Sequence, residues 1–425
     1  RVLFTLEGEP WRVHRAVIKD VLSPMAVDGM GAAFEAVAFQ MARALGEHLK
    51  RNELPFVDVY AVFVRYHLAA AALAFAGEDL GFFRTELLPG GSGGGVASSP
   101  SLAENIVSAF EFFLKSMPQF RTGDTDNPEW QAHAVKLKQA ARRVVEACLS
   151  KPTTTKTAMH VFHEAYAKQL PSAEDAREAT VEKLLEILFA GFNTVATGLS
   201  FALFYLATNP LYLADVHKEV DAVMREHDFT KGGAVDLSNL TLLRAGFLES
   251  LRLVPPTAFT ARQINEDEDL ALDSSGVVLP RGTDVLIPIV FLAQCPVWGE
   301  DAASFNPPRF LDRPTPPAGA FIPFSYGPRN CPGQMLGTNE ALTALAVLIH
   351  FFTFELPSGS KQTPKWSGFG VRPFDAGVQR VALNLKVTRR ALHKLATAKP
   401  WVLPQQATSA ASQVLGALGS QSQRR

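Results

Sequence analysis

The stretch Phe324-Ser325-Tyr326-Gly327-Pro328-Arg329-Asn330-Cys331-Pro332-Gly333 carries the strongest signal in this sequence of 425 residues. It places one cysteine, Cys331, in a loop that has glycine on both sides. Gly327 and Gly333 can adopt backbone conformations that are closed to other residues, so the chain can fold closely around a bound group. The loop therefore predicts that Cys331 presents its sulfur to a ligand. The alternative is a buried structural cysteine in a glycine-rich turn.

A thiolate that binds haem iron must be held at a fixed distance from the porphyrin. It must also receive backbone N–H hydrogen bonds, which adjust the redox potential of the iron. Phe324 can shield the sulfur, and Arg329 is placed to pair with a haem propionate. The loop thus favours a haem site with Cys331 as the metal ligand.

The composition of the whole chain is that of a globular protein, with 47% hydrophobic and 20% charged residues. The net charge of -1 gives no reason to expect nucleic acid as a partner. The three cysteines, Cys148, Cys295 and Cys331, are far apart and odd in number. They argue against a disulfide framework and for a reducing compartment.

Hydrophobic periodicity predicts a mainly α-helical fold with small β-sheets. Helices are expected at residues 11–22, 33–51, 59–75, 103–117, 130–150, 173–208, 212–225 and 334–352, short strands at 276–279 and 284–289, and a β-hairpin at 369–387. The apolar run 187–207 is long enough to cross a membrane. Polar residues such as Asn193 and Thr194 recur within it, however, and they favour a buried central helix.

Glu249 and Arg252 lie three residues apart, on one face of a predicted helix, where they can form an ion pair. Such a pair by itself is usually a solvated surface contact. A second arginine, Arg309, follows in a proline-rich turn. We expect Glu249 to be buried and bridged by both arginines, because charged groups that satisfy one another can be buried together.

Three further groups of residues are candidates for ligand binding. Gly191 would let a ligand approach the central helix, and Thr194 can bond back to a carbonyl and open that helix locally. A polar patch at a helix contact is the alternative. Trp11 and Arg15 lie one helical turn apart and can both donate to an anion, although an isolated pair of this kind is more often ordinary packing. Arg262, in a β-like stretch, is another candidate for an anionic group.

The order and spacing of these motifs resemble the cytochrome P-450 superfamily from Trp11 to about Arg389. The resemblance implies a cytochrome P-450-like haem domain over residues 1–390, with a flexible glycine-rich insertion at 89–100 and a disordered tail at 391–425. It also implies that the N-terminal anchor, first strands and first helices of the family are missing. We therefore expect the strand at 284–289 to lack sheet partners and the chain alone to fold poorly.

By the same resemblance, Cys331 is the axial ligand of haem b, and the propionates are neutralised by Trp11, Arg15, Arg262 and Arg329. Thr194 would assist O2 binding and proton delivery, while Asn193 departs from the Asp or Glu usual in the family. An amide cannot ionise, so proton delivery is expected to be slower or to pass through water. Substrate contacts are expected from Phe192, Val195, Val254 and Phe259.

The function implied is a haem-thiolate monooxygenase that acts with O2 on a lipophilic small molecule. Electrons are expected from a partner such as an NADPH-dependent flavin reductase or a ferredoxin. One alternative is a hydroperoxide isomerase or dehydratase of the same family that needs no external electrons. Another is a haem-binding homologue without enzymatic activity. The resemblance also implies the cytosolic face of the endoplasmic reticulum membrane, provided that the full-length protein has the N-terminal anchor of the family.

Overall fold

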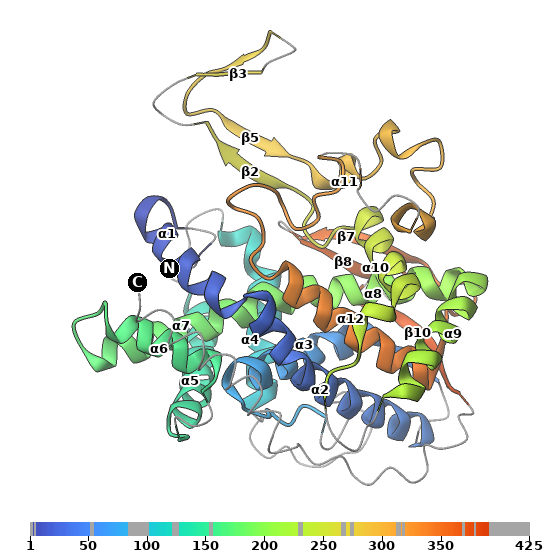
Figure 1. The fold of residues 1–425 in the computed structure, drawn as a ribbon, viewed down its shortest axis with the longest axis horizontal. Coiled ribbons are helices and arrows are strands. Elements are labelled where there is room, and N and C mark those ends of the chain that lie inside the picture. Colours follow the sequence, from blue (N-terminus) through green and yellow to red (C-terminus); the bar gives the residue numbers. More distant parts are fainter. Residues whose placement is uncertain are drawn as a thin grey trace.

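A computed structural model describes residues 3, 6–51, 55–83, 102–120, 127–152, 156–227, 233–264, 269–272, 276–311, 316, 319–367, 370–377 and 380–390. Helices form most of the body (Figure 1). They are α1 Gly8–Val21, α2 Pro24–Arg51, α3 Val59–Ala76, α4 Leu102–Phe120, α5 Pro128–Leu149, α6 Ala158–Ala167, α7 Ala173–Phe192, α8 Thr194–Thr208, α9 Pro210–Glu226, α10 Thr241–Leu253, α11 Ile289–Leu292 and α12 Gln334–Phe351. Short 3-10 helices lie at Leu237–Asn239, Pro296–Trp298 and Pro307–Phe310.

The core is built around three apolar helices, α3, α8 and α12. α3 packs on α2, α7 and α8, and α12 packs on α2, α8 and α9. Every residue of α3 except Ala61 is buried. Two helical stretches, Val59–Ala76 and Ala173–Thr208, are long and apolar enough to cross a membrane. Packing within the protein covers 94% and 61% of their apolar windows, which accounts for their composition.

The helix that the sequence predicts over 173–208 is divided in two. α7 ends at Phe192, and α8 begins at Thr194. The residue between them, Asn193, is a turn with φ -90° and ψ -38°. The apolar pattern is continuous across this point, so periodicity alone does not show where the helix is interrupted.

Small antiparallel sheets lie around the helical body, four of them within the described residues. The strands are β1 Phe56–Asp58, β2 Thr260–Gln263, β3 Leu270–Ala271, β4 Val278–Leu279, β5 Asp284–Ile287, β6 Phe352–Glu355, β7 Gln362–Ser367, β8 Gly370–Asp375, β9 Arg380–Val381 and β10 Asn384–Arg389. The sheet orders are β1-β10-β6, β2-β5, β3-β4 and β7-β8-β9. β10 pairs with the distant β1 and with β6, so the predicted hairpin at 369–387 is wrong beyond β9.

The strand predicted at 284–289 also differs from expectation. It ends at Ile287, and α11 begins at Ile289. It does have a sheet partner, because Asp284–Ile287 pairs antiparallel with Thr260–Gln263. The prediction that this strand lacks partners is therefore wrong. Two strands from nearby parts of the chain can pair antiparallel with each other without an additional strand.

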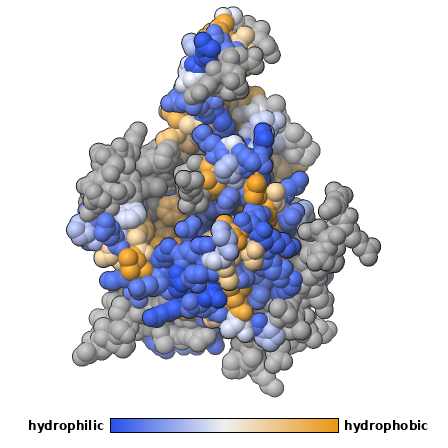
Figure 2. All heavy atoms as spheres, turned by 90° about the vertical axis from the view of Figure 1, so that its left-hand side faces the viewer, coloured by the Kyte–Doolittle hydropathy of each residue, from blue (hydrophilic) through white to orange (hydrophobic). Residues whose placement is uncertain are grey.

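The sheets β2-β5 and β3-β4 together form a ribbon that projects from the body (Figure 1). Hydrophobic side chains are exposed near its end, among them Leu270, Leu272, Val277 and Val278. Figure 2 shows this ribbon at the top of a face that is otherwise largely hydrophilic. The predicted insertion at 89–100 and the predicted tail at 391–425 lie outside the described residues.

Candidate active site

The cysteine loop is a tight turn that leads directly into α12. The backbone N–H of Cys331 donates to the carbonyl of Phe324 over 2.8 Å, and the N–H of Asn330 donates to the carbonyl of Gly327 over 2.9 Å. Gly327 has a φ of +77° and Ser325 a φ of +62°. The left-handed conformation is ordinary for glycine and unusual for serine, so the loop is shaped at some cost in backbone energy. The result is a Cys331 side chain that is exposed at the end of a well-bonded loop.

The pKa of the Cys331 thiol is set by opposing influences. Burial of the sulfur raises it, while a hydrogen bond from the Gly333 backbone and the positive charge of Arg15 lower it. Burial has the largest effect, so the pKa of the Cys331 thiol lies above its ordinary value. A cation bound at the sulfur would reverse this balance, since a metal ion deprotonates a coordinating thiol.

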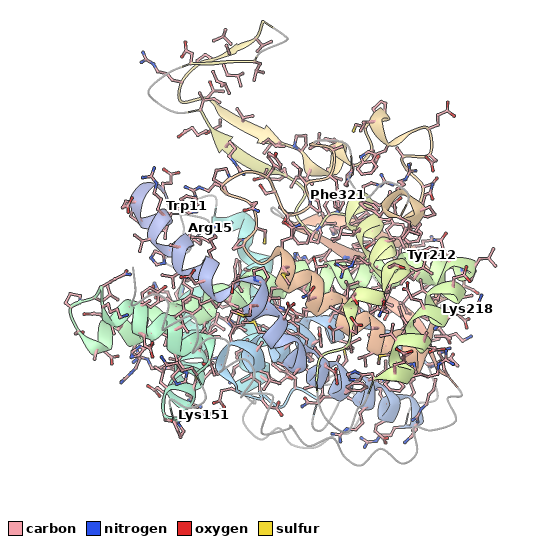
Figure 3. All side chains as sticks on the ribbon, viewed as in Figure 1. Trp11, Arg15, Lys151, Tyr212, Lys218 and Phe321 are labelled. Carbon is pink, nitrogen blue, oxygen red and sulfur yellow. The ribbon has the colours of Figure 1, made fainter. Side chains whose placement is uncertain are left out.

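Two arginines from distant parts of the chain, Arg15 and Arg262, contact the cysteine loop, and a third, Arg329, belongs to the loop. Arg15 donates to the carbonyl and to the side-chain oxygen of Asn330, over 2.9 and 2.6 Å. Arg262 donates to the Ser325 hydroxyl over 3.0 Å and to the carbonyl of Tyr326 over 3.2 Å. Figure 3 shows Arg15 on α1, close to Trp11.

Arg329 completes this group, which we call the loop arginines (Arg15, Arg262 and Arg329). It donates to the carbonyl of Leu6 over 2.7 Å, and its guanidinium carbon lies 4.5 Å from the centre of the Trp11 ring. Among the described residues, none of the three loop arginines forms an ion pair with a carboxylate. Guanidinium groups of this kind can bind an anionic ligand.

The interruption between α7 and α8 carries the predicted catalytic residues Asn193 and Thr194. The Thr194 hydroxyl donates to the carbonyl of Ala190 over 2.8 Å and is exposed. Asn193, in contrast, is 8% exposed, and its side-chain oxygen accepts a hydrogen bond of 2.9 Å from the Tyr60 hydroxyl. Thr194 thus satisfies a carbonyl at the break while its oxygen remains open to further hydrogen bonds.

A model of the family described as cytochrome P450 matches residues 1–376. This chain belongs to the cytochrome P450 family. Cytochromes P450 hold haem through a cysteine thiolate, and relatives in the family include hydroxylases and monooxygenases. The protein is accordingly an oxidoreductase of the cytochrome P450 monooxygenase class.

Two relatives and one solved structure illustrate the range of this similarity. The mitochondrial 25-hydroxyvitamin D-1 alpha hydroxylase of Homo sapiens is 26% identical over 382 residues, covering 85% of this chain and 72% of the relative. A cytokinin hydroxylase of Arabidopsis thaliana is 38% identical over 178 residues, covering 41% of this chain and 33% of the relative. The crystal structure of the cytochrome P450 CYP102L1 has a TM-score of 0.72 at 20% identity, covering 90% of this chain and 80% of that one.

The residues of this cytochrome P450 fit a haem. Cys331 is the exposed thiol of a loop with internal backbone hydrogen bonds, and it lies beside the loop arginines, whose charges have no carboxylate partner among the described residues. Haem carries two propionates and an iron that prefers a thiolate in this family. The donor set therefore matches both the metal and the anionic edge of the group.

The buried ion cluster expected from the sequence is present. Arg252 donates two hydrogen bonds to the carboxylate of Glu249, over 2.7 and 2.8 Å, and both side chains are 0% exposed. Arg309 donates to the same carboxylate over 3.3 Å. Arg252 also donates to the carbonyls of Ala293, Ala302 and Ser304. The cluster ties α10 to the segment that leads toward the cysteine loop.

The four predicted substrate residues lie in different surroundings. Phe192 is 1% exposed and packs in the main core, with its ring centre 5.1 Å from that of Phe110. Val195 is half-buried and faces Gly337 on α12. Val254 is buried in a smaller cluster that includes Val371, and Phe259 packs against that cluster. Their roles toward a substrate stay predictions.

A cavity of about 620 Å³ opens beside Cys331. It is lined by residues of α1, α10, α12 and the cysteine loop, and three of these are basic: Arg15, Lys19 and Arg244. Its described lining contains no acidic residue. Sequence analysis did not identify Lys19 or Arg244, nor Tyr60 as a partner of Asn193. Their signal is weak, because each is an ordinary residue of a helix whose neighbours come from distant segments.

Proposed function

We propose that this chain is a haem-thiolate monooxygenase that inserts one oxygen atom of O2 into a lipophilic small molecule. The observation that carries the proposal is the combination of the Cys331 loop with the loop arginines. Haem, when bound, supplies one-electron and O2 chemistry that no amino-acid side chain provides. Cys331 would hold the iron, and Trp11 with the loop arginines would hold the propionates.

The chain contributes proton handling at the break between α7 and α8. The Thr194 hydroxyl donates to the Ala190 carbonyl, so its lone pairs can accept a hydrogen bond from solvent on the exposed side. The neighbouring Asn193 cannot ionise and is already bonded to Tyr60. We infer that protons reach the site through water and Thr194, and not through the side chain of residue 193.

The substrate is proposed to be lipophilic because of the residues expected to meet it. Val195, Val254 and Phe259 are apolar, and binding sites for small molecules are lined mainly by such side chains. A screen of hydrophobic compounds for displacement of a ligand from the haem iron, read by absorption, would test this part of the proposal.

Electrons are proposed to come from a separate protein, either an NADPH-dependent flavin reductase or a ferredoxin. The basic lining of the cavity beside Cys331 suits an acidic partner. Reversing charge in the variant Lys19→Glu/Arg244→Glu should slow reduction by the partner and leave peroxide-driven turnover unchanged. Equal loss of both activities would contradict this docking site.

The first experiment is the absorption spectrum of the reduced protein with carbon monoxide, for the wild type, Cys331→Ala and the control Cys295→Ala. We expect the red-shifted Soret band of a thiolate complex in the wild type and the control, and its loss in Cys331→Ala. A haem-containing wild type without this band would contradict Cys331 as the ligand.

A second function, rearrangement of hydroperoxides without external electrons, is favoured by one observation. The side chain of Asn193 carries no charge, and its oxygen already accepts a hydrogen bond from Tyr60. Turnover of a fatty-acid hydroperoxide in the absence of NADPH and partner, at a rate above that of the electron-driven reaction, would support it. Bound haem with no turnover under either supply would instead support a non-enzymatic homologue. Attachment to the endoplasmic reticulum rests on family resemblance alone, and membrane fractionation of the full gene product tests it.

A further inference from the structure

Tyr60 on α3 makes a polar contact with the Asn193 side chain from the helical core. α3 is buried along almost its whole length and packs on both α7 and α8. A phenol in such surroundings needs a hydrogen-bond partner, because an unpaired hydroxyl in an apolar core is costly. The Tyr60 hydroxyl donates to the side-chain oxygen of Asn193 over 2.9 Å, and it also forms a hydrogen bond with the Arg372 side chain of β8.

On a second side, the amide of Asn193 lies against β8 at Gly370. A Cβ atom placed on Gly370 would lie 2.8 Å from the Asn193 side-chain nitrogen, closer than real Cβ contacts. The absence of a side chain at residue 370 therefore gives the amide its space. One turn further along α8, the Thr197 hydroxyl donates to the carbonyl of Val371 over 2.8 Å, so the strand and the helix are joined next to the break.

The direction of the Tyr60 hydrogen bond determines how the amide is oriented. Burial raises the pKa of Tyr60 above its ordinary value, so the phenol keeps its proton. Arg372 can only donate to the phenol oxygen, which leaves the phenol O–H to donate to Asn193. The oxygen of Asn193 must then face Tyr60, and its nitrogen must face Gly370. Neither group carries charge, which is consistent with their burial.

The same break positions Thr194. Asn193 is buried between α3 and β8, whereas the hydroxyl of Thr194 is exposed and bonds to the carbonyl of Ala190. Because the two residues are adjacent in the chain, fixing one side chain constrains the backbone that carries the other.

We propose that Tyr60 is a positioning residue, which holds Asn193 and thereby sets the geometry of the helix break that presents the Thr194 hydroxyl. This inference rests on the proposed monooxygenase function, since Thr194 matters only if the site handles protons. Tyr60 itself touches neither substrate nor haem in this proposal.

The test compares Tyr60→Phe with the matched control Tyr66→Phe. Both tyrosines lie on α3 and are buried, and both substitutions remove one hydroxyl. The hydroxyl of Tyr66, however, donates to the carbonyl of Glu340 over 3.1 Å, away from the break. A general loss of stability would affect both variants, whereas an effect on the break should appear only in Tyr60→Phe.

Two readouts do not require turnover. Amide hydrogen exchange over residues 190–197 should be faster in Tyr60→Phe by roughly three- to tenfold, as expected for loss of one buried hydrogen bond. The C–O stretching frequency of the carbon monoxide complex should shift in this variant only. A third readout is the fraction of electrons recovered in product, which should fall by a similar factor while the haem content is unchanged.

Two further variants separate the proposal from a folding defect. Asn193→Ala combined with Tyr60→Phe should give no more exchange than either single variant, because both break the same contact. Gly370→Ala should push the amide from its place and speed exchange over 190–197 even with Tyr60 intact. The proposal is overturned if Tyr60→Phe matches Tyr66→Phe, if the two single effects multiply, or if Gly370→Ala leaves exchange unchanged.

Failure of the proposed function gives a different result. If the carbon monoxide spectrum shows no Cys331-dependent band, the monooxygenase proposal fails, and the exchange measurements still report whether Tyr60 holds the break.

Discussion

Two groups of arginines in this cytochrome P450 differ in the chemical groups that they contact. Arg252 and Arg309 meet at Glu249, whose carboxylate accepts hydrogen bonds from both, and Arg252 is 0% exposed. The loop arginines gather around the cysteine loop, and within the described residues they contact carbonyls, a side-chain amide, hydroxyls and the face of an indole ring.

The difference separates arginines that serve the fold from arginines that are suited to binding a ligand. A buried guanidinium with its carboxylate in place is satisfied by the protein itself, and it serves the fold. Guanidinium groups that have no carboxylate partner among the described residues, and that lie beside the Cys331 thiol, are suited to a ligand that brings its own negative charge. The following predictions test this distinction, starting with the largest expected effect.

Glu249→Gln should be the most damaging change. It would leave Arg252 buried without a counter-charge, and the free energy of unfolding should fall by about 3–5 kcal/mol, as when one partner of a buried pair is removed. Urea denaturation measures this change. The control Glu300→Gln, at an exposed position, should behave like the wild type. A loss as small as that of the control would mean that the cluster is not structural.

Arg329→Met should weaken haem binding and leave the stability of the protein almost unchanged, in contrast to Glu249→Gln. Loss of a charge-assisted contact should weaken haem affinity by roughly 10- to 100-fold, while the stability of the haem-free protein changes little. Haem transfer to apomyoglobin measures the affinity. Arg143→Met, at an exposed position on α5, serves as the control. Equal haem affinity in both variants would remove Arg329 from the site.

The pH dependence of stability should arise outside both arginine groups, because arginine stays charged over the accessible range. Burial lowers the pKa of His217, and of His350 despite its hydrogen bond to Asp221. The unfolded chain therefore binds more protons below pH 6.5. Stability should be complete above that pH and should fall as the pH decreases below it.

Thermal unfolding between pH 5 and 8 measures this trend. The variant His217→Gln/His350→Gln should lose stability less steeply on acidification than the wild type does. An identical slope in the two proteins would assign the pH dependence to other groups.

The smallest effect is expected from Asp301→Asn. Asp301 pairs with Arg309 at 2.5 Å, but it lies at the exposed rim of the cluster. Hydrogen bonds from Arg309 and Asn306 lower its pKa to about 2. Its contribution should thus be present above pH 4 and be lost only as the pH falls through about 2. Near neutral pH, the urea midpoint of Asp301→Asn should stay close to that of the wild type, in contrast to Glu249→Gln.

Much of the site could be predicted because its signals are local. The Glu249–Arg252 pair depends on a spacing of three residues in a helix, and the cysteine loop is ten consecutive residues. The limits of several main helices were also close, since periodicity reports which face of a segment is apolar. The helix predicted at 33–51, however, begins earlier, at Pro24. The partner of Asn193 was not predictable, because Tyr60 is 133 positions away and is an ordinary aromatic residue of an apolar helix.

The sequence by itself determined the family, the cysteine loop and most helices of this protein, because motifs, spacing and hydrophobic period are properties of short segments. Only the tertiary structure decided the sheet partners of β5 and β10, the place of Phe192 in the core and the meeting of Arg15 with Asn330, 315 positions away. The physical reason is that contacts between distant segments depend on how all the helices pack together, and no single segment contains that information.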